Sequence, residues 1–140
     1  MSSTRLVTFT LEDRLYGIDV GAVQEVLRGL PRTRIPLAPS ALAGLINLRG
    51  QVLTAIDLRE QLGLPPRRDD LEPMLVVIRV DGEPVALLVD SIGSVVDVEA
   101  DQFESPPDTL SGQSRQLILG AYKLTGRLLL ALDVDRAVAA

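Results

Sequence analysis

One sequence pattern occurs twice, and it constrains the fold more than any other feature of the chain. Residues 44–58 carry two glycines, a leucine and an aspartate at positions that recur in residues 120–134 with one constant offset. The matched residues are Gly44 and Gly120, Leu48 and Leu124, Gly50 and Gly126, and Asp57 and Asp133. A weaker echo precedes each copy, in which Gly17, Val23 and Val26 match Ala86, Ile92 and Val95. Since a repeat usually dictates the architecture, we expect one fold unit used twice, with function where the copies differ.

The composition excludes several classes of function. Aromatic residues make up only 3% of the 140 residues, and the net charge is −5, so neither base stacking nor phosphate attraction favours a nucleic-acid binder. The chain has no cysteine and no histidine, which removes disulfides, thiol nucleophiles, imidazole bases and the usual zinc ligands. With 46% apolar residues but no long apolar run, we expect a soluble domain without cofactor or membrane insertion.

Alternating apolar residues and frequent turn signals predict a mostly β protein of the barrel or sandwich type. Strands are expected at residues 6–11, 15–19, 45–49, 51–57, 74–80, 83–90, 95–98, 117–124 and 127–133. Valine and leucine spacing predicts a short helix or helical turn over 21–28, and Asp57 and Asp133 each precede a brief helical segment, at 58–62 and up to 137. Loops are expected at 31–40 and 97–108. The polar connector 65–70 is the expected boundary between the two units.

The repeated aspartates and glycines have a structural reading and a functional one. Asp57 and Asp133 could share a proton and activate water as a carboxylate pair in a hydrolase. Each, however, stands where aspartate caps the exposed N–H groups of a helix, and we favour that role. The repeated glycines, Gly44, Gly50, Gly120 and Gly126, belong to predicted hairpins and lack a phosphate-binding motif, so we assign them to turns and close strand crossings.

Residues present in only one copy are better candidates for function. Arg49 corresponds to Thr125 and Glu25 to Ser94, so the fold does not require a charged residue at either place. They form either an asymmetric polar feature of the surface or an ordinary solvated ion pair. Val23, Val26 and Val95, with Ile92, belong either to the core or to an apolar strip that faces a groove between the copies and receives a partner helix.

Four stretches of the chain, taken in order, carry a family pattern: residues 6–27 (LVTFTLEDRLYGIDVGAVQEVL), 43–64 (AGLINLRGQVLTAIDLREQLGL), 74–96 and 117–138. The strongest element is Gly-x-x-Asn-Leu-Arg-Gly followed by Ile-Asp-Leu-Arg. With these stretches the chain resembles the CheW family of bacterial chemotaxis coupling proteins. The chain departs from the family's pattern at Ala86, where glycine is usual, at residues 53–55, where Val-Pro-Val is common, and at residues 28–30.

The resemblance implies an all-β fold with short helices, built from two intertwined five-stranded barrels of the SH3 type. A single CheW-like domain would then span residues 4–138. Its approximate subdomains would be 14–70 and 71–138, with the strand at 5–11 shared between them.

The resemblance also implies a non-enzymatic, cytoplasmic adaptor in a two-component signalling system. Such a protein couples the cytoplasmic tips of transmembrane chemoreceptors (methyl-accepting chemotaxis proteins) to the regulatory domain of the histidine kinase CheA. The receptor-binding groove would include the matching positions Val23, Glu25, Val26, Gly44, Arg49 and Val95, and the kinase would contact exposed barrel ends. A chemosensory pathway that serves motility and one that serves another output both stay open, and the hydrolase with Asp57 and Asp133 is a further alternative.

Overall fold

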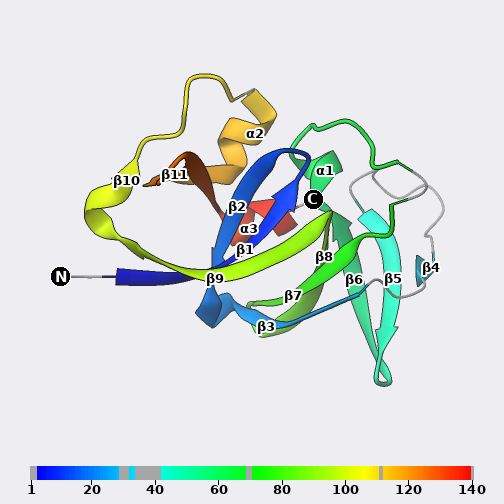
Figure 1. Ribbon diagram of the computed structural model, residues 1–140. Helices are drawn as coiled ribbons and strands as arrows, with labels where there is room; N and C mark the ends of the chain where they lie inside the picture. Colours follow the sequence, from blue (N-terminus) through cyan, green and yellow to red (C-terminus); the bar gives the residue numbers. More distant parts are fainter. Residues whose placement is uncertain (1–2, 29–31, 34–41, 69–70, 111, 140) are drawn as a thin grey trace.

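The computed structural model describes residues 3–28, 32–33, 42–68, 71–110 and 112–139, and Figure 1 shows their arrangement. The chain forms two six-stranded sheets and several short helices, so the predicted all-β fold class is confirmed. In each sheet, five strands are of ordinary length and one has only two residues.

The first sheet has the order β10-β11-β12-β2-β1-β9 and the second has the order β3-β7-β8-β6-β5-β4. The strands of the first sheet are β1 (Ser3–Leu11), β2 (Arg14–Asp19), β9 (Ser91–Glu99), β10 (Phe103–Glu104), β11 (Ile118–Leu124) and β12 (Arg127–Leu132). Those of the second are β3 (Val23–Arg28), β4 (Arg32–Thr33), β5 (Leu42–Leu48), β6 (Gln51–Asp57), β7 (Met74–Val80) and β8 (Glu83–Val89). The helices are η1 (Val20–Ala22), α1 (Leu58–Gln61), η2 (Ala100–Gln102), α2 (Gly112–Leu117) and α3 (Val134–Val138).

The two sequence copies exchange their leading hairpins. Hairpin β1–β2 precedes β3–β6 in the chain, but it pairs with the strands that follow the second copy's hairpin: β1 with β9 and β2 with β12. Hairpin β7–β8 pairs in the same way with β3 and β6. Each sheet therefore combines a hairpin from one copy with four strands from the other, which is how the halves intertwine.

The sheets are not divided along the chain at residue 70. Strand β2 belongs to the first sheet although its residues fall within 14–70, and β7 and β8 belong to the second although they fall within 71–138. The limits 14–70 and 71–138 follow the sequence copies rather than the sheets, and as subdomain limits they stay a prediction.

The helix or helical turn expected over residues 21–28 is found only at Gly21 and Ala22, and the prediction is wrong for residues 23–28. The structure has a 3₁₀ turn at η1 followed by strand β3, which pairs antiparallel with β7 from Val23 to Arg28. Side chains of β3 alternate between half-buried and exposed, as in a strand at the edge of a sheet. The spacing of the valines suits both a helix and a strand. The segment forms a strand because pairing with the edge of β7 gives the backbone N–H and C=O groups of both segments hydrogen-bond partners.

The loop expected over 97–108 is also only partly correct. Strand β9 continues to Glu99, and η2 and β10 follow before the chain becomes irregular. The short helix α2 was not expected from the sequence. Of the loop expected at 31–40, only residues 32–33 are described, where they form β4; residues 31 and 34–41 lie outside the described residues, as do residues 69–70 of the connector.

Most buried side chains form one cluster between the two sheets. It includes Phe9 and Tyr16 of the first sheet, whose rings stack with centroids 5.8 Å apart, and Ile56 and Leu87 of the second. Leu58, Leu117 and Ala137 add the three α-helices to this cluster. A smaller cluster lies within each sheet. Because the largest cluster belongs to both sheets, neither half has a complete core without the other.

Candidate functional site

Arg49 occupies a strained position at the tip of the β5–β6 hairpin. Arg49 and Gly50 form its two-residue turn with φ of 52° and 84°, the combination found in type I′ turns. The Oδ1 atom of Asn47 accepts a hydrogen bond of 3.0 Å from the Gly50 N–H and stabilises this turn. The first turn position favours Asn, Asp or Gly, so an arginine there is unusual, and its counterpart Thr125 has no positive φ. Strain of this kind often marks a functional residue.

Glu25 on β3 holds the Arg49 guanidinium by a bidentate ion pair. Nη1 and Nη2 of Arg49 lie 2.9 and 2.6 Å from the two carboxylate oxygens of Glu25. Hydrogen bonding to Arg49 lowers the pKa of Glu25, and the same contact raises the pKa of Arg49. Strand β3 and hairpin β5–β6 lie toward opposite ends of the strand order, so the pair joins two ends of a sheet that curls. Figure 1 shows the hairpin tip extending beyond the rest of this sheet.

The valines expected in the groove differ in exposure. Val26 on β3 is 43% exposed and Val95 on β9 is 53% exposed, whereas Val23 is half-buried and packs against the main core. Strand β3 is an edge of the second sheet and β9 is an edge of the first. The two exposed valines therefore present apolar surface on edge strands of both sheets.

Gly44 is buried, and its role is structural. It is buried in β5 with φ of 136°, at a shift in the register between β5 and β6. A residue with a Cβ would be strained in this conformation. Of the six residues expected in the groove, the structure thus exposes Arg49, Val26 and Val95, half-buries Glu25 and Val23, and buries Gly44.

The two repeated aspartates act as helix caps on different sheets. Asp57 Oδ1 accepts a hydrogen bond of 3.0 Å from the Arg59 N–H at the start of α1. Asp133 Oδ1 accepts one of 3.2 Å from the Arg136 N–H at the start of α3. Asp57 ends β6 of the second sheet and Asp133 follows β12 of the first. Each carboxylate is thus engaged at a helix start of its own.

Sequence reasoning missed a semi-buried charge network at the point where β8 crosses to β9. Asp90 Oδ1 accepts hydrogen bonds from Nε of Arg59 and of Arg67, at 2.9 and 3.0 Å. Its Oδ2 accepts from Arg59 Nη2 at 2.5 Å and from the Glu12 N–H at 2.8 Å. Burial raises the pKa of Asp90, but these hydrogen bonds outweigh it, so the pKa lies below the usual value. The signal available was Arg59 in the Ile-Asp-Leu-Arg motif, while its partner Asp90 is distant in the chain.

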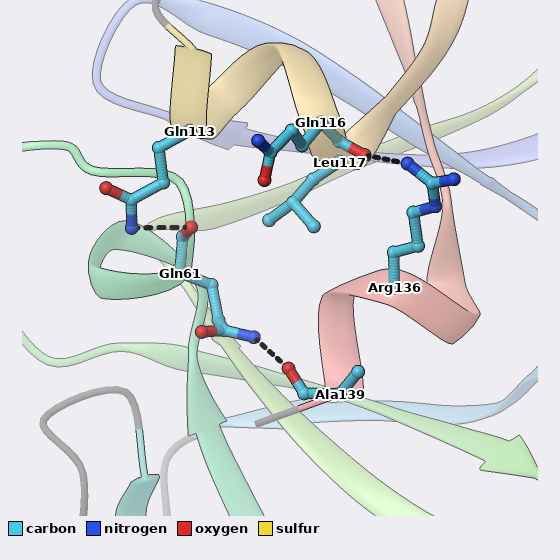
Figure 2. A pocket seen from close by; sticks show the side chains of 6 residues that line it. All are labelled: Gln61, Gln113, Gln116, Leu117, Arg136 and Ala139. Carbon is cyan, nitrogen blue, oxygen red and sulfur yellow. Dashed lines mark hydrogen bonds between the residues drawn. The ribbon is translucent and has the colours of Figure 1, made fainter.

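Polar side chains also bridge the three short α-helices, as Figure 2 shows. Gln61 of α1 donates to the carbonyl oxygen of Ala137 at 2.6 Å and to that of Ala139 at 3.2 Å. Gln113 of α2 donates to the carbonyl of Gln61 at 3.0 Å, and Arg136 of α3 donates to the carbonyl of Gln116 at 3.3 Å. These bonds surround a cavity of about 320 Å³. They satisfy carbonyl groups at helix ends, which is a structural role.

In the described part of the chain, no helix is long and apolar enough to cross a membrane. No group of three or more carboxylates among these residues is arranged to hold a metal ion.

Comparison with known proteins gives a consistent result. A family model for the CheW-like domain matches residues 5–140. The chain is 29% identical to a chemotaxis protein CheW of Rhizobium meliloti, over 93% of this chain and 84% of that protein. It is 30% identical to one of Klebsiella aerogenes, over 91% and 77%. The crystal structure of the scaffolding protein TtCheW from Thermoanaerobacter tengcongensis superposes with a TM-score of 0.83 at 27% identity, over 94% of this chain and 89% of that one.

Proposed function

Because this chain belongs to the CheW-like domain family of chemotaxis scaffold proteins, we propose that it couples the cytoplasmic tips of chemoreceptors to the regulatory domain of the histidine kinase CheA. It would do so as a cytoplasmic adaptor without catalytic activity, recruited to receptor arrays by its partners. The observation that carries the proposal is the Glu25–Arg49 ion pair at a strained hairpin tip, which only one of the two sequence copies possesses.

The ion pair suits recognition of a partner for two physical reasons. It holds the guanidinium in one orientation, so less conformational entropy is lost when a partner binds. It also leaves the Arg49 side chain 69% exposed, with donors that a partner's carboxylate or carbonyl can use. Val26, one residue after Glu25, adds exposed apolar surface on the same edge strand. A charged anchor beside apolar contacts is a common composition for an interface.

The groove and its six residues belong to this proposal, as does the identity of the partners. We propose that a helical hairpin of the receptor lies against β3 and β9, with Val26 and Val95 as apolar contacts. Kinase contacts would lie on other exposed ends of the two sheets. A pathway that serves motility and one that serves another chemosensory output would both use these contacts. The hydrolase alternative is disfavoured because Asp57 and Asp133 each cap a helix, on different sheets.

Two substitutions with a matched control test the proposal. Arg49→Ala and Glu25→Ala should each weaken capture of a purified receptor tip and lower receptor-dependent kinase activity, while thermal unfolding stays cooperative. Thr125→Ala alters the equivalent turn in the other copy and should leave both readouts unchanged. Equal capture of the receptor tip by all three variants would contradict the proposed site.

A double-mutant cycle separates the ion pair from its individual charges. If the pair acts as a unit, the double variant Glu25→Ala/Arg49→Ala should bind the receptor tip about as weakly as either single variant. Fully additive losses would mean that each residue contacts the receptor independently. Kinase binding measured without receptor should be unaffected in every variant, which assigns the defect to the receptor side.

A further inference from the structure

The two sheets have the same strand arrangement, but a position that is buried and apolar in the second sheet is exposed and polar in the first. In the second sheet the parallel pair β6 and β8 places Asp57 beside Leu88, which is fully buried. In the first sheet the parallel pair β12 and β2 has the matching register, with Ala131 beside Gly17. Two residues further along, Asp19 takes the place that Leu88 has in the second sheet, and Asp19 is exposed. The first sheet therefore has an exposed aspartate at the position where the second sheet has a buried leucine.

An open cavity of about 770 Å³ lies at this place in the first sheet. Its lining includes three acidic residues, Asp19, Asp133 and Asp135, and three apolar or aromatic residues, Phe103, Leu119 and Tyr122. Leu119 is 57% exposed and Phe103 is 44% exposed, and the Phe103 ring meets the Tyr122 ring edge-on with centroids 5.0 Å apart. The lining thus combines negative charge with apolar and aromatic side chains.

The charges in the lining favour a cation. Asp133 lies 3.7 Å from Nε of Arg136, but neither Asp19 nor Asp135 has an ion pair within the described residues. Arg79 is the cationic residue of the lining, and its Nη1 donates to the Gly82 carbonyl at the turn of its own hairpin. Among the residues that the structure describes, these two carboxylates have no cationic partner.

The second sheet has a cation at the position of the repeat that carries Asp135 in the first. The residue that matches Asp135 there is Arg59, two positions after the capping aspartate in each copy. Its guanidinium is held by Asp90 and lies 3.5 Å from Glu12, and Arg67 from the following connector joins them. One half therefore supplies its own guanidinium groups, whereas the other half has a carboxylate at the matching position and an open cavity.

We propose that this cavity binds an arginine side chain presented by a partner protein. The guanidinium would bond to the carboxylates of Asp19 and Asp135, and the stem and a neighbouring apolar residue would pack on Leu119 and the Phe103 ring. None of the six residues assigned to the receptor groove lines this cavity. The inference therefore goes beyond the proposed function and stands or falls independently of it.

The test is a titration of the isotopically labelled full chain with a blocked Leu-Arg-Leu tripeptide, followed by amide chemical shifts. We expect saturable shifts at Gly17, Asp19, Leu119 and Asp135. The same peptide with citrulline in place of arginine keeps the shape without the charge, and it should bind at least tenfold more weakly.

Three variants locate the site. Asp19→Asn keeps an acceptor for the Gly21 N–H, and Asp135→Asn changes an exposed helix position, so both should fold and both should weaken the peptide at least threefold. Asp19→Leu copies the leucine of the second sheet and should abolish binding. Shifts that cluster elsewhere, equal binding of the citrulline peptide, or no shifts at all would overturn the proposal. So would unchanged affinity in both asparagine variants.

Discussion

Replacing Asp90 by asparagine should destabilise the fold strongly. The two oxygens of Asp90 accept four hydrogen bonds, two each. An amide of the same shape keeps one acceptor oxygen, so two of these bonds are lost. Hydrogen bonds to charged groups contribute about 1.5–3 kcal/mol each, so the loss is about 3–5 kcal/mol when some solvent access is allowed for. Such a loss is a large part of the roughly 5–15 kcal/mol that stabilises an ordinary domain.

The measurement is urea unfolding of the wild type and Asp90→Asn, with Asp97→Asn as the matched control. Asp97 pairs with Arg5 at 2.9 Å, but both side chains are more than half exposed, so the same substitution there should change stability little. A loss below about 1 kcal/mol for Asp90→Asn would refute the reasoning, because it would mean that the two arginines find equivalent partners without this carboxylate.

Three further outcomes follow from the geometry. Folding lowers the pKa of Asp90, so its carboxylate stabilises the fold fully above the pKa of an unfolded aspartate. This stabilisation is lost as the pH falls through the pKa of Asp90 in the folded protein. The free energies of unfolding of the wild type and Asp90→Asn should therefore converge in acid. Gly120→Ala should lower the free energy of unfolding by about 1–3 kcal/mol, measured by thermal unfolding. The added Cβ would lie 2.3 Å from the Phe103 ring and 2.5 Å from the Glu104 carbonyl oxygen. At Gly126, by contrast, a Cβ would meet no atom within 4 Å, and only the positive φ opposes a side chain there. Asn47→Ala removes the hydrogen bond that supports the turn carrying Arg49. It should therefore reduce the free energy of receptor-tip binding more than it reduces the free energy of unfolding.

Local patterns in the sequence predicted most strands correctly, because alternation and turn residues are local signals. The segment 21–28 failed because its valines suit a helix or a strand, and the pairing with β7 that decides is distant in sequence. Local patterns could not predict the exchange of hairpins either. A repeat shows which strands are equivalent, but not whether a hairpin pairs with strands of its own copy or of the other copy.

Comparison of the two copies singled out part of the candidate site before the structure was known. Glu25 and Arg49 were recognised because Ser94 and Thr125 replace them, and the structure brings the two side chains together. The Asp90 network and the cavity beside Asp19 were missed, because each depends on residues from several strands that no spacing relates.

The exchanged hairpins have a consequence for how such a chain could arise. A polypeptide with only one copy would have four strands that lack their partner hairpin, and a hairpin that lacks its strands. It could satisfy both by exchanging hairpins with a second identical chain, which would make a half-length ancestor a swapped dimer. Joining the two copies in one polypeptide makes this association intramolecular, and the stability of the fold no longer depends on protein concentration.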